Sequence, residues 1–324
     1  MDSLFRPRHG KQRPENYVMR CAAFPARRPI SSPSCQSCKL VLAAILFLGG
    51  PAAHAGSDWL QPGHRLPVTG GVSTLEGAAG GGLVPWAMIA GYGTRDEIGG
   101  SLFYTAVAID DFSLASTGAA LGFYDRVELS FAEQRFGLGE TVPGEVIHVD
   151  TIGLKVKIAG DAVFASNHWM PQVAAGLQYK KNQDADIPDL LGARDSSGTD
   201  LYLAASKLWL AGPFGRSLFA NLTLRATRAN QLGILGFGGD KNDNYRLMPE
   251  ASLAVLLRDD VAMGVEYRDK PDNLSAFREQ SFSDVFIAWL PSKQVSLTAA
   301  YTDLGNIANQ PDQKGAYLSV QLNH

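Results

Sequence analysis

The chain has 324 residues, a formal net charge of −3 and three cysteines, all within residues 21–38. Eight of its 29 basic residues and two of its 32 acidic residues precede Gly56, so a chain that begins there carries −9. That acidic balance argues against nucleic acid as a partner. Such a chain also has no cysteine, which excludes disulfides, thiolate nucleophiles and thiolate metal sites. No cofactor and no metal are expected.

An export signal is predicted near the N-terminus. Lys39 precedes the short apolar run 40–48, and an A-x-A site follows at 53–55. This is the order of the basic region, apolar core and cleavage site of a secretory signal peptide. The run is too short for a membrane-spanning helix, which needs about 20 apolar residues. We therefore expect export of the chain and cleavage after Ala55.

The rest of the chain alternates apolar and polar residues in strand-length pieces. In 217–227 the even-numbered residues are Leu or Ala, whereas most odd-numbered ones are polar. Successive side chains of a strand point to opposite faces. Transmembrane barrels turn the apolar face toward lipid and the polar face toward the lumen. A water-soluble β-sandwich alternates as well, so this pattern alone leaves both folds open. The alternation recurs at 127–132, 151–158, 261–268, 295–302 and 317–322.

The lengths of the connections favour the barrel. Long polar links at 181–198, 230–244 and 270–281 alternate with short ones at 210–215 and 291–293. Outer-membrane barrels have this asymmetry, with short periplasmic turns and longer external loops. A sandwich has no physical reason to alternate its loop lengths so regularly.

We therefore predict an all-β, antiparallel transmembrane β-barrel in the cell outer membrane, surrounded by outer-membrane lipid. About fourteen strands fit the pattern, an even number that places both termini on the periplasmic side. Glycines weaken the first two strands, at 66–75 and 83–92, so twelve strands with a plugged or irregular N-terminal part is the alternative. The other twelve are expected at 98–108, 113–123, 126–136, 146–158, 169–180, 199–209, 216–229, 245–257, 260–269, 282–290, 294–302 and 314–322.

This interpretation divides the chain into a removed N-terminal extension with its signal peptide, a periplasmic segment and the barrel, at 1–55, 56–65 and 66–324. The periplasmic segment is too short to form a large plug. Translation can start at Met1 or at Met19, because the region before Lys39 is long for a signal peptide.

Two motifs suggest chemistry that their surroundings do not support. The glycine-rich run 77–82 looks like a phosphate loop, but neither a Lys-Ser/Thr pair nor a helix pattern follows it. An external loop or close packing of the backbone is expected instead. His148 and Asp150 share one strand face and could form the catalytic pair of a lipid hydrolase at the membrane rim. The sequence fixes no serine beside them, and we do not expect an enzyme.

Four lumen-facing charges are the candidate constriction of a channel: Arg225, Glu250, Glu266 and Arg268. The hairpin around 230–244 brings the first two together, and the next tight turn adds the other two. Opposite charges a few ångströms apart can set ion selectivity, or they can simply neutralise each other. Glu128 opposes Lys155 on another hairpin and is expected to be purely structural.

The favoured function is a passive channel for small solutes or ions, because a barrel of this size can enclose a polar lumen. A channel for hydrophobic molecules is a close variant. An outer-membrane lipid-modifying enzyme is one alternative, and a closed structural or interaction barrel is another. The solute, the oligomeric state and the openness of the lumen are not fixed by the sequence.

The segments 69–87, 91–96, 124–130 and 134–136 resemble a family of Gram-negative exported proteins known as domain of unknown function 3034. The resemblance covers most of the chain after the signal peptide and implies an outer-membrane setting by association. It brings no substrate, cofactor or catalytic residue. The chain ends in His324, whereas outer-membrane barrels often end in an aromatic residue.

Overall fold

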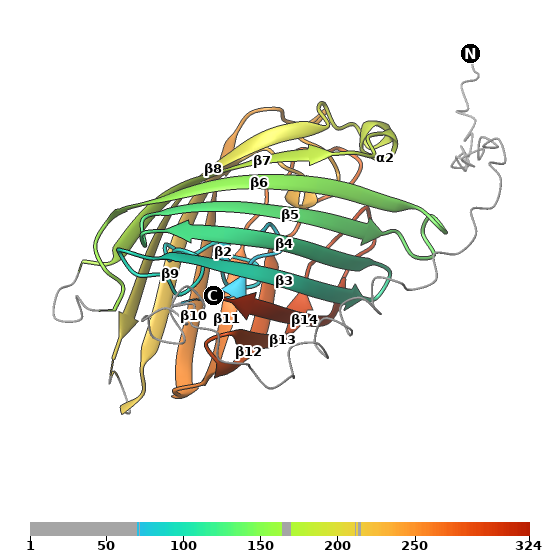
Figure 1. Cartoon of the computed structure of the whole chain (residues 1–324). Helices are drawn as coiled ribbons and strands as arrows, with labels where there is room; N and C mark the ends of the chain where they lie inside the picture. Colours follow the sequence, from blue (N-terminus) through green and yellow to red (C-terminus); the bar gives the residue numbers. More distant parts are fainter. Residues whose placement is uncertain (1–69, 71, 164–169, 211, 213–214) are drawn as a thin grey trace, which may run out of the picture. The chain divides into compact units, whose positions relative to one another are not determined.

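The computed structural model describes residues 70, 72–163, 170–210, 212 and 215–324. The predicted signal peptide, its cleavage site after Ala55 and the segment 56–65 lie outside the described residues. In the described part of the chain, no helix is long and apolar enough to cross a membrane. Strands dominate the fold (Figure 1).

Twelve antiparallel strands of the described chain close into one barrel (Figure 1). Each strand pairs with its neighbours in sequence, and the last strand closes the ring against the first, from the pair Gly315↔Ile109 to the pair Asn323↔Ser101. The predicted antiparallel barrel is therefore confirmed, with the alternative count of twelve. The strands are β3 (Ile98–Ile109), β4 (Ser113–Phe123), β5 (Val127–Gly137), β6 (Val146–Ala159), β7 (Gln172–Asn182), β8 (Ser197–Trp209), β9 (Leu218–Thr227), β10 (Arg246–Arg258), β11 (Val261–Arg268), β12 (Phe282–Ser292), β13 (Val295–Asp303) and β14 (Lys314–Asn323).

The alternation of the sequence separates an apolar exterior from a buried interior. In β9, Leu222 points outward and is 68% exposed, whereas Asn221 and Thr223 point inward and are buried. Large apolar side chains are exposed in the same way on other strands, including Leu102, Ile152, Leu247 and Leu318. A closed barrel pairs the backbone groups of every strand, which lipid requires. An apolar exterior on such a barrel is the architecture of bacterial outer-membrane proteins.

The two ends of the barrel differ in their connections. We call one end the short-turn end, with turns at 124–126, 259–260 and 293–294, and expect it to face the periplasm. The other, the long-loop end, carries α2 (Asp186–Leu190) and η4 (Gln231–Gly233) within its loops. The predicted asymmetry holds for most connections, with exceptions at both ends: 110–112 is a short turn at the long-loop end, and the connection 160–171 at the short-turn end is longer than a tight turn. The long loops are 138–145, 183–196, 228–245, 269–281 and 304–313.

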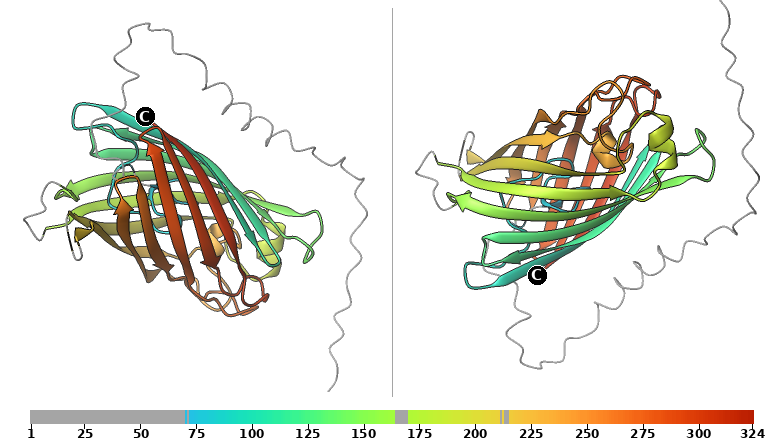
Figure 2. Two further views of the ribbon diagram at one scale, coloured as in Figure 1. Left: turned by 90° about the horizontal axis from the view of Figure 1, so that it is seen from below. Right: turned by 90° about the horizontal axis from the view of Figure 1, so that it is seen from above.

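Residues 72–93 lie inside the barrel, and we call this segment the plug; its cyan trace runs within the ring of strands in both views of Figure 2. All of its residues are buried. Its regular structure consists of β1 (Val72–Ser73) and β2 (Ala79–Gly80), which pair with each other. The prediction of barrel strands at 66–75 and 83–92 was therefore wrong where residues are described. The alternative prediction of twelve strands with a plugged N-terminal part is confirmed, whereas the segment 56–65, expected to be too short for a large plug, lies outside the described residues.

The composition of the plug explains why it is not part of the wall. A strand between lipid and lumen alternates, but 83–90 is almost continuously apolar, which suits a segment enclosed on all sides. Its glycines allow close packing of the backbone: a Cβ at Gly81 would lie 2.0 Å from Glu266 Oε1. Gly77 adopts a φ of +92°, a conformation that favours glycine. The glycine-rich run is thus an internal packing segment, one of the two expected alternatives to a phosphate loop.

Candidate functional site

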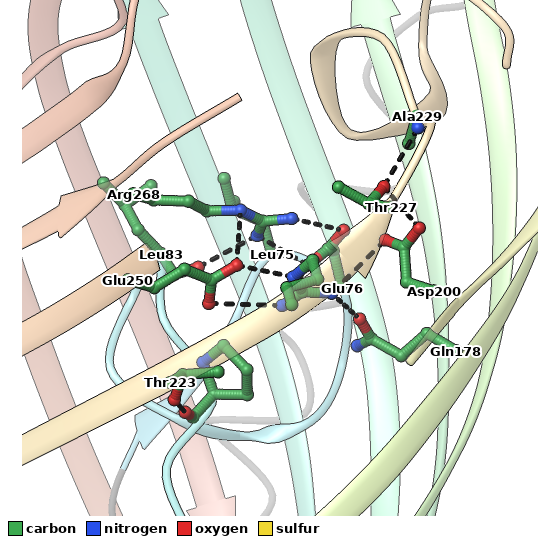
Figure 3. Close-up of polar contacts among 12 residues, drawn as sticks. Leu75, Glu76, Leu83, Gln178, Asp200, Thr223, Thr227, Ala229, Glu250 and Arg268 are labelled. Carbon is green, nitrogen blue, oxygen red and sulfur yellow. Dashed lines mark hydrogen bonds and ion pairs between the residues drawn. The ribbon is translucent and has the colours of Figure 1, made fainter. Parts of the chain in front are cut away.

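Six buried charges meet inside the barrel, and we call them the charge cluster. The plug supplies one of them, and each of five consecutive strands, β7 to β11, supplies one more. Three are acids and three are bases, and none is more than 5% exposed. In Figure 3, Glu76 of the plug lies between Arg268 and Asp200, and Arg268 binds its carboxylate. The members are Glu76, Lys180, Asp200, Arg225, Glu250 and Arg268.

The carboxylate of Glu76 is held by three cations at once. Arg268 binds it with both terminal nitrogens, Nη1 to Oε2 at 2.6 Å and Nη2 to Oε1 at 3.1 Å. Lys180 Nζ also donates to Oε1, and Arg225 Nη2 lies 3.6 Å from Oε2. A two-pronged arginine–carboxylate pair is among the strongest side-chain contacts. The plug is therefore joined to the wall by the ion pairs of Glu76, its one acidic residue.

Arg225 connects the remaining members of the charge cluster. Its guanidinium donates to both carboxylate oxygens of Glu250, to Gln178 Oε1 at 2.6 Å and to Asp200 Oδ2 at 3.3 Å. It also lies over the ring of Tyr202, 5.3 Å from the centroid. Charges buried away from water require such complete pairing.

The four residues predicted as a constriction do converge. Arg268 Nε lies 3.4 Å from Glu250 Oε1, and Glu250 also pairs with Arg225. Glu266 lies one step further along the lumen and joins the others through the plug. It accepts a hydrogen bond of 2.8 Å from the backbone nitrogen of Leu83, whose carbonyl accepts one of 3.0 Å from Arg268. The structure thus brings the four residues together, with Leu83 of the plug between Glu266 and Arg268, which the sequence did not indicate.

Three members of the charge cluster were missed by sequence reasoning. Lys180 and Asp200 have the lumen parity of their strands, but nothing in the sequence indicates that β7 and β8 face β11 across a filled lumen. Glu76 did leave a signal, because it is the one charged residue between Arg65 and Arg95. A lone acid in an apolar, glycine-rich segment must find a cation if that segment is buried.

A second anchor ties the plug to β5 and β6, the strands that precede those of the charge cluster. Glu128 accepts hydrogen bonds from the backbone nitrogens of Ala79 and Ala90, at 3.0 and 2.9 Å. Lys155 Nζ lies 3.0 Å from Glu128 Oε2 and donates to the carbonyls of Ala79 and Met88, both at 2.8 Å. The predicted Glu128–Lys155 pair exists, but it is not purely structural in the wall, since four of its contacts hold the plug.

Neutral side chains of the wall satisfy further backbone groups of the plug. Ser206 Oγ accepts a hydrogen bond of 2.8 Å from the Ala87 nitrogen, and Gln172 Nε2 donates to the Ala87 carbonyl at 2.7 Å. Thr223 Oγ1 donates to the Pro85 carbonyl at 2.8 Å. Buried backbone groups need such partners because an irregular segment cannot supply them itself.

Apolar walls border the plug on both sides of the charge cluster. Toward the short-turn end, a cavity of about 30 Å³ is lined by Trp86 of the plug and by apolar residues of β9 to β12, among them Phe219 and Phe286. Toward the long-loop end, a cavity of about 20 Å³ lies among Leu75, Phe136 and residues of the long loops. We call them the inner and outer chambers. Each has room for about one water molecule, so neither chamber holds a larger solute.

The long loops cover the outer chamber and are tied to one another. Gln231 Nε2 donates to Glu279 Oε2 at 2.6 Å and to the Asn306 carbonyl at 2.9 Å, which joins three loops. Lys270 Nζ lies 3.0 Å from Gln231 Oε1 and 3.1 Å from Glu279 Oε2. Burial lowers the pKa of the Lys270 ammonium to about 8, although Glu279 opposes that shift. Three of the long loops are thus joined to one another over the outer chamber.

The two residues considered for hydrolysis have separate partners. His148 Nδ1 lies 2.9 Å from Asp184 Oδ2, and Asp150 accepts a hydrogen bond of 2.8 Å from Gln183 Nε2. Both lie on outward-facing positions of β6 near the long-loop end. Within the described residues, no serine hydroxyl bonds to His148, and no group of three His, Cys, Asp or Glu side chains could hold a metal.

Comparison with known proteins identifies a family and a fold. Residues 69–321 match the family described as "Protein of unknown function (DUF3034)". No curated protein matches the chain in sequence. The barrel is similar to the KdgM porin (10% identity, 68% of this chain and 98% of that one, TM-score 0.44) and to Omp33 of Acinetobacter baumannii (6%, 71% and 100%, 0.43). It is also similar to outer membrane phospholipase A from Escherichia coli (12%, 69% and 89%, 0.37). At these values the likenesses do not indicate what the barrel transports or catalyses.

Proposed function

Because the chain belongs to the DUF3034 family, whose function is unknown, we propose from its own geometry that it is an outer-membrane channel closed by the plug. In this proposal the barrel is the conduit for small solutes and the plug is its gate. The observation that carries it is the Glu76 ion pair: a segment that fills the lumen is held by ion pairs and side-chain hydrogen bonds rather than by strand pairing with the wall.

The plug can leave without opening the barrel. The wall closes through β14 and β3 with no contribution from the plug to its strand pairing. The plug pairs only with itself, and 94–97 connects it to the start of β3 at the short-turn end. Its withdrawal therefore costs side-chain contacts and the backbone hydrogen bond of 3.1 Å from the Tyr92 nitrogen to the His324 carbonyl, but none of the strand pairing of the wall. A wall that is complete by itself is what a removable plug requires.

A closed structural barrel is the competing function, because the lumen is full and covered. Two observations favour a channel. The plug makes polar contacts that can be exchanged for water or solute, and the charge cluster joins the plug to five consecutive strands of the wall, β7 to β11. The lipid-modifying enzyme is disfavoured because His148 has an aspartate partner and no serine partner among the described residues.

A reversible lock tests whether the plug moves. Ser206 Oγ lies 2.8 Å from the Ala87 nitrogen, so the pair Ala87→Cys and Ser206→Cys brings two thiols close across the plug and the wall. The sequence has no cysteine after Cys38. We expect liposomes with the oxidised protein to be tight and the same liposomes to become permeable to small solutes after reduction, because only reduction frees the plug.

The single variants Ala87→Cys and Ser206→Cys are the matched controls and should not respond to reductant. Equal permeability before and after reduction, in protein shown by mass spectrometry to form the disulfide, would rule out the plug as a gate. A barrel that stays tight in both states would be the closed structural barrel.

The four predicted constriction residues give a second expected result. In open channels, Arg225→Ala should shift ion preference toward cations and Glu266→Ala toward anions, since opposite charges a few ångströms apart interact by about 4 kcal/mol at an effective dielectric constant of 20. The lipid-facing Leu222→Ala should change neither. Reversal potentials in a salt gradient measure this preference. Unchanged selectivity in both charge variants would mean that the four residues neutralise each other and do not set ion selectivity. Glu250 and Arg268 are not substituted in these variants, so any change in selectivity comes from Arg225 or Glu266.

A further inference from the structure

Glu76 is bound in the way that a separate anionic ligand would be bound. Its carboxylate receives two nitrogens of Arg268 and the ammonium of Lys180, and it lies near Arg225. All three cations belong to the wall, whereas the carboxylate belongs to the plug. If the plug leaves, the wall keeps a preformed carboxylate site and loses the group that fills it.

The charge balance makes that vacancy specific for an anion. With Glu76 present, the cluster has three cations and three carboxylates. Without it, the cluster holds three cations against Asp200 and Glu250. An unpaired buried charge is costly unless something neutralises it. Water and neutral solutes cannot restore the balance, but one monoanion can.

The surroundings of Glu76 add an apolar requirement. The neighbouring Leu75 lines the outer chamber together with Phe136, Leu232 and Phe282. The Leu75 carbonyl is held by Ser116 Oγ at 2.7 Å and by Gln134 Nε2 at 2.8 Å, which fixes its side chain beside those apolar residues. The plug therefore presents a carboxylate and an adjoining apolar group to the wall. A solute that replaces both would carry the same two features.

We propose that Lys180, Arg225 and Arg268 form the solute site of this barrel, that it takes an amphipathic monocarboxylate, and that Glu76 with Leu75 occupies it in the closed state. This inference rests on the proposed function, because the solute enters as the plug leaves. Binding and opening are then one exchange: the carboxylate of the solute takes the contacts of Glu76, and its apolar body takes the place of Leu75 in the outer chamber. The plug thus acts as a tethered competitor of the solute.

Release of the plug can be measured without measuring conductance. Ala87 is fully buried in the plug, so the rate at which Ala87→Cys reacts with a membrane-impermeant maleimide reports plug release. In nanodiscs, octanoate should raise this rate by about tenfold, a usual size for coupling between two linked events. Octanol has the same apolar body without the charge, and acetate has the charge without the body. Neither should raise the rate.

Two variants test whether octanoate acts at the charge cluster. Glu76→Gln removes the internal competitor, so radiolabelled octanoate should bind this protein more tightly than the parent, after subtraction of empty nanodiscs. Arg268→Gln, in barrels with heat-modifiable gel mobility, should lose the response of the label to octanoate. Arg228→Gln is the matched control at the rim, where the arginine pairs with Asp195 and Asp243, and it should keep the response.

Each contrary result has one meaning. An equal response to octanol and octanoate, no response to octanoate, or an undiminished response in folded Arg268→Gln protein would each overturn the site. If octanoate releases the plug but the protein never conducts, the proposed carboxylate site is supported and the proposed channel function is refuted. If the protein conducts when the disulfide lock is reduced but octanoate does not change the labelling rate, the channel function is supported and the carboxylate site is refuted.

Discussion

Replacing Arg225 by methionine is expected to lower the free energy of unfolding of the barrel by about 3–5 kcal/mol, the cost of leaving a buried charge without its partner. Arg225 is 1% exposed and pairs with Glu250, Asp200 and Glu76. Methionine keeps the unbranched aliphatic stem of the side chain but not the guanidinium, so the double variant described below is needed to separate lost charge from lost packing. Urea-dependent unfolding in lipid vesicles measures the difference.

Arg228→Met is the control, three residues along the chain. Arg228 also bridges two carboxylates, Asp195 and Asp243, but both are about half exposed. Exposed pairs contribute about 1 kcal/mol or less. A further variant, Arg225→Met with Glu250→Leu, leaves two cations facing two carboxylates and should recover much of the loss. If the single and double variants are equally unstable, the damage comes from packing and not from charge.

Replacing Glu128 by leucine should both destabilise the barrel and release the plug. The change leaves the Lys155 ammonium without its carboxylate, at a cost of about 3–5 kcal/mol for a broken buried pair. It also removes the acceptor of two plug nitrogens, at Ala79 and Ala90. We expect faster maleimide labelling of Ala87→Cys as well as a lower free energy of unfolding.

The double variant Glu128→Leu with Lys155→Met separates these two effects. Removing both charges should restore most of the stability, because a buried pair is often replaceable by apolar residues. The plug still loses its contacts with both side chains, so labelling should stay fast. Labelling as slow as in the parent would show that the pair serves the wall alone, as the sequence suggested.

The wall of the barrel was predictable because the environment on each side of a strand determines which residue types it carries. Lipid on one side and a polar interior on the other impose a period of two, and the strand expected at 113–123 is found at those residues. Loop lengths then set the order of the hairpins. Neighbouring strands pair in sequence order, so the contact of Arg225 with Glu250 and that of Glu250 with Arg268 also followed from local geometry.

The position of the plug inside the barrel is set by the tertiary structure and could not be predicted from the sequence. Residues 72–93 contact lipid nowhere, so no alternation marks their position, and an apolar segment with glycines suits a weak strand as well as a filled lumen. The partners of Glu76 lie 104 and 192 residues away, at Lys180 and Arg268. A hairpin sets contacts between neighbouring strands, but contacts across a lumen exist only after the ring has closed. The sequence by itself therefore determined a membrane barrel and the charges of its wall, while closure of the ring decided that one glutamate of the chain would lie among them.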